Sequence, residues 1–475
     1  MLFNSLQYLA FLPLVFAIYW GVNNKFLKLQ NLLLLAASYY FYACWDWRFL
    51  FLLVFSTGLD YYTGLKMKDA STVRIKKFWF WLSIGINVGF LGIFKYYNFF
   101  AESFAELLSG FGFQANFWTL QVILPVGISF YTFHGLSYVI DIYKNRIEPE
   151  RNIVDYSLFV SYFPLLVAGP IERATHLLPQ IKKRRHFNYD QAIQGVKQII
   201  WGLFKKVVIA DNCAFFVNQL FDQPGNYSAS ELWLGAVLFA FQIYGDFSGY
   251  SDIALGTSKL FGIELLKNFN FPYFSKDIAD FWRRWHISLS TWFRDYLYIP
   301  LGGSQGGKKM RLRNTMIIFL VSGFWHGANW TFIVWGLIHA LLFIPLLLSD
   351  NNRKHLSDSA YGLKDLPKVL FTFLLVCLAW VFFRADTLSE AGTYISGMFQ
   401  FHEMSLNLFL KNGKYVLFSG ICFISVSFLL YTEWQHIKTS RAEIQLSKVS
   451  LLLLLGMIFF MGAFKNQMSF IYFQF

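Results

Sequence analysis

Long apolar runs alternate with short polar connections along most of this chain. The first four runs cover about residues 3–21, 29–45, 48–64 and 78–95, and three more lie at 368–383, 413–431 and 449–464. Each is close to the ~20 residues that a helix needs to cross a bilayer. The pattern predicts an all-α, polytopic membrane protein with roughly ten or more transmembrane helices.

The middle of the chain is less regular. An apolar run at 119–143 is interrupted by Pro125 and Gly127, and the run at 154–171 carries basic residues on both flanks. Because basic flanks on both sides conflict with a simple crossing, we expect 154–171 to be re-entrant, entering the bilayer and returning. Further helices are expected at 190–220, 231–247 and 251–263.

Two later segments have different characters. Residues 274–313 are rich in Arg, Lys, Trp and Tyr without a spanning run, which is typical of an amphipathic helix near the membrane interface. The run from Met316 to Leu348 is apolar and long enough for a buried helical hairpin. We expect all of these segments to form one membrane-embedded domain over residues 1–475.

Composition and charge agree with a membrane protein. The 475 residues are 56% hydrophobic and only 15% charged, against about 25% charged in a typical soluble domain. The net charge of +13 comes from Lys and Arg in short loops, where they orient helices and meet anionic headgroups, so nucleic-acid binding is not indicated. The basic group from Lys66 to Lys77 is then cytoplasmic, and the N-terminus lies outside.

The ends of the chain and its cysteines add little chemistry. Leu2 to Trp20 lacks a basic leader and a cleavage site, so we expect a retained first helix in the cytoplasmic (inner) membrane. The four cysteines are scattered without CxxC spacing, so neither a disulfide framework nor a zinc site is expected.

His326 is the leading candidate for chemistry. It lies in the Met316–Leu348 run, which contains no Lys, Arg, Asp or Glu, and it is flanked by Trp325 and Gly327 with Asn329 nearby. A titratable ring in a lipid-length segment is costly unless it is paired or lines a wet cavity. His326 is therefore either a general base in an aromatic pocket or a packing histidine satisfied by a neighbouring carbonyl.

His339 lies in the same run, thirteen residues further on. On an unbroken helix the two rings would face roughly opposite directions. They can share a site only if the chain breaks near Gly327 or Gly336. A packing role is the simpler interpretation of His339.

His286 lies in the sequence FWRRWHISLSTWFRDYLYIP. Arg283 and Arg284 could hold a phosphate or carboxylate, and Trp285 could stack on a substrate. The alternative is an amphipathic surface helix that its aromatic residues anchor at the interface.

Asp246 and Asp252 lie in YGDFSGYSDIALG, beside an apolar run. A carboxylate there needs a partner, so either could orient a histidine, pair with Arg or form a structural pair. The spacing of the glycines in this segment favours close helix packing over phosphate binding.

Two stretches together resemble the membrane-bound O-acyltransferase (MBOAT) superfamily, closest to its bacterial, alginate O-acetyltransferase-like branch. They read DFWRRWHISLSTWFRDYLYIPLGG and SGFWHGANWTFIVWGLIHA. Four other segments fit the same branch: LPVGISFYTFHGLSYVIDIYK, VAGPIER, FQIYGDFSGYSDIALG and the terminal FIYFQF.

The resemblance implies helices around a central tunnel and a role for two histidines. His326 matches the family's catalytic histidine, and His286 matches a second histidine or its Asn counterpart. His326 would act as general base or form an acyl-imidazole, with Asn329 or Trp330 as an oxyanion donor. Arg283, Arg284, Trp285, Trp325, Asn329 and Asp246 are our expected substrate-binding residues.

The resemblance also implies the substrates and partners. A thioester donor, acetyl-CoA or an acyl carrier, would be a co-substrate rather than a bound cofactor, and would meet Arg283, Arg284, Lys308 and Lys309. The acyl group would cross the membrane to an exported polysaccharide such as alginate, with a periplasmic acetyltransferase partner completing the transfer. D-alanyl transfer to teichoic acid is the main alternative, and a glycan or lipid transporter is another.

Overall fold

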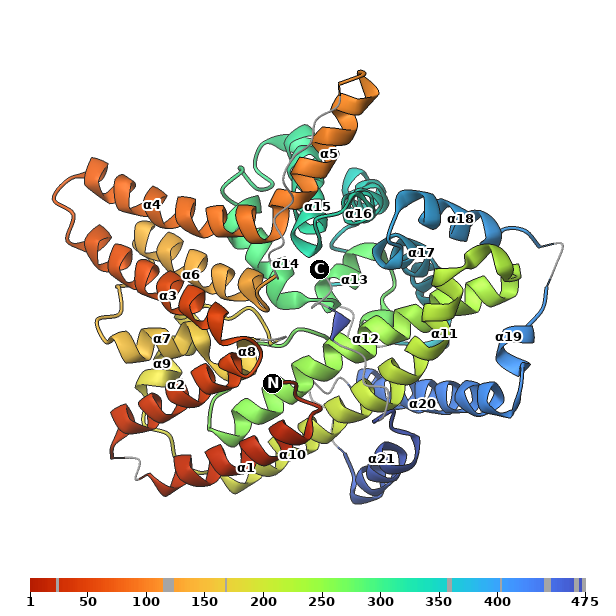
Figure 1. The fold of residues 1–475 in the computed structure, drawn as a ribbon, viewed down its shortest axis with the longest axis horizontal. Coiled ribbons are helices and arrows are strands. Elements are labelled where there is room, and N and C mark those ends of the chain that lie inside the picture. Colours follow the sequence, from red (N-terminus) through yellow and green to blue (C-terminus); the bar gives the residue numbers. More distant parts are fainter. Residues whose placement is uncertain are drawn as a thin grey trace. The chain divides into compact units, whose positions relative to one another are not determined.

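The computed structural model describes residues 1–22, 25–113, 124–166, 169–356, 361–401, 404–439, 446–464 and 470–471. Within these ranges the regular elements are all helical, which confirms the predicted all-α class (Figure 1). The chain forms two compact units: Met1–Gly195 with Thr257–Leu266, and Val196–Gly256 with Lys267–Phe475. A single domain over residues 1–475 stays a prediction.

The first unit follows the N-terminal apolar runs closely. Its helices are α1 (Leu6–Gly21), α2 (Leu27–Ala43), α3 (Trp47–Lys68), α4 (Val73–Leu91), η1 (Gly92–Tyr96), α5 (Tyr97–Gly110), α6 (Ile128–Tyr143), α7 (Ile153–Ser161), α8 (Phe163–Leu166) and α9 (Ala174–Lys182). Side chains of Ser5, Asp46 and Thr72 cap the starts of α1, α3 and α4 by accepting backbone N–H groups. The polar connections therefore fix where these apolar helices begin.

The predicted interruption before α6 is confirmed. Gly127 has φ +74°, and a Cβ there would lie 2.2 Å from the carbonyl oxygen of Leu166. The chain can turn at this point only because Gly127 has no side chain. Residues 119–123 of the predicted run lie outside the described residues.

The segment predicted to be re-entrant forms two short helices. α7 has 9 residues and α8 has 4, with a break at Tyr162 between them. At 1.5 Å per residue α7 is about 14 Å long, far short of the ~30 Å bilayer core. The lengths agree with a segment that does not cross, while its place in a membrane stays a prediction.

α10 (Tyr189–Leu203) continues from the first unit into the second. The elements that follow are η2 (Phe204–Ala210), α11 (Asp211–Asp222), η3 (Pro224–Asn226), α12 (Ala229–Leu260), η4 (Pro272–Phe274), α13 (Ile278–Arg284), α14 (Ile287–Phe293), η5 (Arg294–Tyr298), α15 (Gly307–His326), α16 (Trp330–Leu348), η6 (Leu363–Asp365), α17 (Leu366–Arg384), α18 (Leu388–Met398), α19 (Asn407–Leu410), α20 (Gly413–Lys438) and α21 (Lys448–Met461).

The separate helices expected at 231–247 and 251–263 are wrong, because α12 runs unbroken for 32 residues. Its glycines serve packing instead. A Cβ at Gly245 would lie 2.8 Å from the carbonyl oxygen of Lys205, and one at Gly249 would lie 2.8 Å from that of Gly202. The glycines therefore allow α12 to lie directly against the backbone of α10 and η2, as their spacing predicted.

Four helices in the described residues are long and apolar enough to cross a membrane: Val73–Gly110, Trp330–Leu348, Leu363–Arg384 and Gly413–Lys438. Shorter apolar helices lie at Leu6–Gly21, Ile153–Leu166 and Lys448–Met461. The membrane character is thus supported, but the expected ten or more crossings are not confirmed. Several apolar runs, such as the one that gives the 16-residue α1, form helices shorter than a full crossing.

Candidate active site

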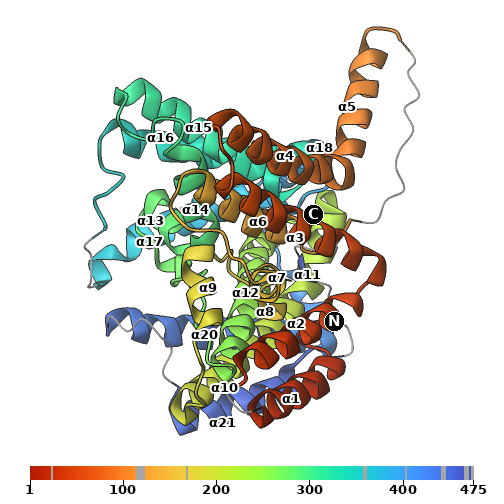
Figure 2. The same cartoon turned by 90° about the vertical axis from the view of Figure 1, so that its left-hand side faces the viewer.

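The predicted hairpin is confirmed and places His326 at its tip. α15 ends at His326, Gly327 is extended, and α16 begins at Trp330. The two helices lie side by side in both views (Figures 1 and 2). A Cβ at Gly323 would lie 2.3 Å from the carbonyl oxygen of Phe332, so the hairpin is packed backbone to backbone.

His326 is buried among aromatic rings, with 2% of its surface exposed. Its ring centroid lies 4.9 Å from that of Trp325, 5.0 Å from Trp335 and 5.4 Å from Phe383. All three contacts are edge-to-face. Such walls exclude water, and this strengthens electrostatic interactions at the imidazole.

His286 lies next to His326, although forty residues separate them in the sequence. The two ring centroids are 6.4 Å apart, and Trp325 contacts both rings, lying 6.0 Å from His286. Phe247 of α12 packs on the His286 ring, with the two ring centroids 4.7 Å apart. His286 is fully buried, and neither ring nitrogen has a hydrogen-bond partner among the described residues.

The backbone at His286 is left-handed, with φ +44° and ψ 54°, an uncommon conformation for a residue with a side chain. Hydrogen bonds on both sides hold it there. Asn270 N donates to Arg284 O at 3.0 Å, and Ile287 N donates to Asn268 O at 2.9 Å. The turn between α13 and α14 therefore fixes the ring at this place, and burial lowers the pKa of His286 so that the imidazole is neutral.

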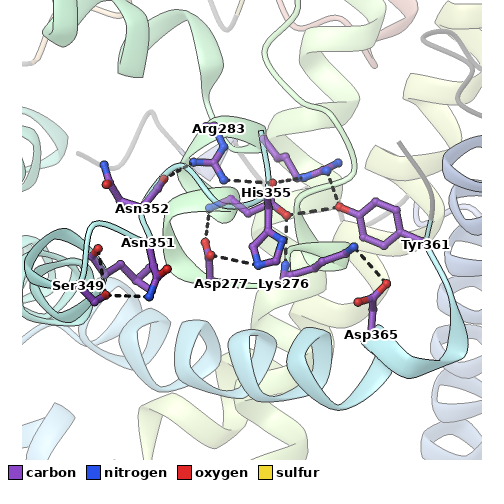
Figure 3. Close-up of polar contacts among 12 residues, drawn as sticks. Lys276, Asp277, Arg283, Ser349, Asn351, Asn352, His355, Tyr361 and Asp365 are labelled. Atoms are coloured by element: carbon purple, nitrogen blue, oxygen red, sulfur yellow. Dashed lines mark hydrogen bonds and ion pairs between the residues drawn. The ribbon is translucent and has the colours of Figure 1, made fainter. Parts of the chain in front are cut away.

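Arg283, near the end of α13, belongs to a polar cluster (Figure 3), and Arg284 joins this cluster through Asp280. Arg284 Nε donates to Asp280 Oδ1 at 2.9 Å and the guanidinium also bonds the hydroxyl of Tyr361. Arg283 Nη1 donates to Asn352 O at 2.9 Å. Lys276 pairs with Asp365 at 3.1 Å, and His355 lies 3.6 Å from Asp277. Much of the positive charge is thus neutralised internally, and a phosphate contact at these arginines stays a prediction.

Two other predicted site residues have structural contacts. Trp285 packs against Phe281 and, at 5.0 Å between centroids, against Trp380, which in turn stacks on Trp335. Asn329 caps α16: its Oδ1 accepts from Thr331 N at 3.0 Å, and its Nδ2 donates to Asp386 O at 2.8 Å. Their contact with substrate stays a prediction.

Asp246 is buried in an ion network. Lys206 Nζ lies 2.8 Å from both Asp246 and Asp211, and Asp246 Oδ2 accepts from Ile471 N at 2.7 Å. Its carboxylate therefore ties α12 to η2, α11 and the C-terminal residues, which favours the structural interpretation over substrate contact. Lys206 was missed, although a lysine inside the apolar run 190–220 is the same signal that singled out His326.

His339 joins this group of rings. Because the chain breaks at Gly327, His339 and His326 both contact Trp335, at 4.9 and 5.0 Å between centroids. The condition that the sequence set for a shared site is met. Trp335 and Phe383 could not be singled out beforehand, because 21% of the chain is aromatic.

The three histidines fall inside a stretch with a known family signature. The model of the membrane-bound O-acyltransferase family matches residues 145–385. A peptidoglycan O-acetyltransferase of Helicobacter pylori is 36% identical across 100% of this chain and 98% of its own length. The chain belongs to the membrane-bound O-acyltransferase family. It is therefore an O-acyltransferase, as the resemblance implied.

Other relatives of this O-acyltransferase have related names. The probable alginate O-acetylase AlgI of Pseudomonas putida is 41% identical over 86% of this chain and 82% of that protein. A teichoic acid D-alanyltransferase of Streptococcus thermophilus is 30% identical over 56% of this chain and 69% of that protein. The branch predicted from the two motifs is confirmed.

Proposed function

We propose that this enzyme O-acetylates an exported polysaccharide, with a thioester on the cytoplasmic side as acyl donor and His326 as the catalytic base. The main support is the buried His326, enclosed by aromatic rings and adjacent to a second buried histidine, in a chain of the O-acyltransferase family. Relatives that match most or all of the chain are named for acetylating alginate or peptidoglycan. Both are polysaccharide-containing polymers with hydroxyl groups.

The chemistry balances with one base. A neutral His326 takes the proton of an acceptor hydroxyl while the hydroxyl oxygen attacks the thioester carbonyl carbon. The tetrahedral intermediate then breaks its C–S bond, and the departing thiolate takes the proton from His326. General-base catalysis contributes roughly 10²–10⁴-fold, and dry aromatic walls protect the thioester from hydrolysis. An acyl-imidazole at His326 is the alternative route.

Trp335 is the best-placed donor for the oxyanion of the tetrahedral intermediate. Its indole is fully buried against His326, and its Nε1–H has no hydrogen-bond partner among the described residues. Asn329, expected in this role, already has both ends of its amide engaged. A donor that is already in place when negative charge develops lowers the barrier.

The donor would approach basic residues at the start of α15. The Lys308 side chain is 58% exposed; its Nζ donates to Leu348 O at 3.0 Å and lies 3.7 Å from Asp350, and Lys309 beside it is exposed. Such cations suit the phosphates of coenzyme A or of a phosphopantetheine carrier. We expect a separate periplasmic acetyltransferase to complete transfer to the polysaccharide.

Isotope-labelled donors test this function. Purified enzyme in vesicles is given labelled acetyl-CoA, or in parallel a D-alanyl carrier, together with the periplasmic acetyltransferase and an acceptor glycan. We expect labelled acetyl esters and no D-alanyl esters, because the D-alanyltransferase relatives match only about half of the chain. Ester formation from the D-alanyl carrier alone would replace the proposal with teichoic acid D-alanylation. Export of glycan without consumption of either donor would instead support a transporter.

A further inference from the structure

A third buried histidine has a defined hydrogen bond that the mechanism above leaves unexplained. His339 on α16 is fully buried, and the indole Nε1–H of Trp282 donates to its Nδ1 at 3.3 Å. The two rings meet edge-to-face with centroids 5.0 Å apart. An indole N–H can only donate, so Nδ1 must be the accepting nitrogen and the neutral ring carries its proton on Nε2.

Trp335 connects this pair to His326. It lies one helical turn before His339, so the two side chains share a face of α16. The Trp335 ring contacts His339 at 4.9 Å, Trp282 at 5.7 Å and His326 at 5.0 Å between centroids. His339 and Trp282 both contact the Trp335 indole, and these contacts set its position beside His326.

Packing alone is a poor explanation of an imidazole at position 339. Its Nε2 is buried without a hydrogen-bond partner among the described residues. Leaving such a group unsatisfied costs about 1–3 kcal/mol, which a leucine or phenylalanine would avoid. The feature that an apolar residue could not supply is the acceptor for Trp282.

We infer that His339 is a positioning residue, which together with Trp282 holds the Trp335 indole in the orientation that His326 needs for acyl transfer. The inference rests on the proposed function, since it assigns Trp335 a place in that reaction. His339 contacts no reacting atom in this scheme. Displacing a group of this kind by about 1 Å can lower a rate by about 10²-fold.

The role of His339 is tested by substitutions that change its hydrogen-bond acceptor and its side-chain volume separately. His339→Leu removes the acceptor but keeps an apolar side chain, whereas His339→Asn keeps an oxygen near the position of Nδ1. We expect kcat to fall at least about tenfold in His339→Leu with KM for the donor unchanged, and to recover in His339→Asn. Trp282→Phe removes the donor and should resemble His339→Leu.

A matched control comes from another indole of the same unit. Trp233 Nε1 donates to Met398 O at 2.9 Å, and its ring packs on Phe399 rather than on the histidines. Trp233→Phe loses an equivalent hydrogen bond and should keep the wild-type kcat per folded enzyme. Thermal unfolding of each variant measures the folded fraction.

A double-mutant cycle tests whether His339 acts through Trp335. Trp335→Phe should lower kcat by itself, and adding His339→Leu should then have little further effect, because the two changes remove one arrangement. Fully multiplicative effects, or a wild-type kcat in His339→Leu, would overturn the inference. Failure of the proposed function would look different from failure of this inference. In that case the wild-type enzyme itself would transfer no acetyl group, although its unfolding temperature could still be measured.

Discussion

At the scale of single residues, the candidate site brings together two imidazoles in different surroundings. His326 lies at the end of a helix among aromatic rings, whereas His286 lies in a left-handed turn with a neutral ring. We therefore propose different chemical roles for them. His326 is suited to move a proton, and His286 to hold a fixed polar edge 6.4 Å away.

The left-handed turn at His286 allows the effect of backbone conformation on stability to be measured separately from the effect of the side chain on turnover. Asn tolerates this conformation better than Ala, so His286→Asn should match the stability of the wild type while His286→Ala loses about 1–2 kcal/mol. Turnover should be lost in His286→Ala with the fold retained. Thermal unfolding and acetyl transfer are measured on the same samples, and normal turnover in His286→Ala would reduce His286 to an anchor.

The residues of the site were only partly predictable. His326 stood out because an apolar run tolerates a titratable ring only for a reason, and that reasoning needs no structure. The approach of His286 to His326 could not be predicted, since it depends on a turn held by Asn268 and Asn270. Asn329 was expected to bind substrate because of its position near His326, but the local need for a helix cap was overlooked.

At the scale of elements, the α15–α16 hairpin carries the site. Gly323 and Gly336 face each other, and each would place a Cβ 2.3 Å from a carbonyl oxygen of the opposite helix. The close approach brings Trp335 between His326 and His339. A larger distance between the two helices would therefore displace the rings of Trp335, His326 and His339 together.

Alanine substitutions test this packing. Gly323→Ala and Gly336→Ala should each lower stability by about 1–3 kcal/mol, because the added methyl meets backbone rather than a side chain that can move. The matched controls are Gly420→Ala in α20 and Gly456→Ala in α21, where the added methyl has nothing within 4 Å. These should be neutral or stabilising, since Ala favours helices. Equal stability of all four variants would contradict the hairpin geometry.

The hydrophobic pattern predicted the N-terminal helices well and failed at α12. Apolar length gave α1 to α4 within a few residues, and Gly127 marked the start of α6. The 32-residue α12 was instead expected as two helices, at 231–247 and 251–263. In the structure Asp246 is satisfied by Lys206, so the helix continues through it.

At the scale of the whole molecule, the chain is a helical membrane enzyme, and its charges predict its orientation. The basic group after α3 predicts a cytoplasmic loop there and an outside connection between α2 and α3. Family membership gives the reaction class, while the orientation decides from which side a donor can enter.

Native Cys44 tests this orientation directly. It is exposed just after α2, whereas Cys213, Cys377 and Cys422 are buried. A membrane-impermeant maleimide added outside intact cells should label Cys44. In a Cys44→Ser background, Ser71→Cys should react only after the membrane is opened. Labelling of Ser71→Cys in intact cells would reverse the predicted topology.

The central claim is that one buried imidazole carries the acyl transfer. The direct measurement is the acetyl ester content of the exported polysaccharide in cells that make either the wild type or His326→Ala at equal membrane levels. We predict that esters fall by at least about 10²-fold in His326→Ala, while the protein remains inserted with its usual unfolding temperature. Esters at the wild-type level in His326→Ala would contradict the account.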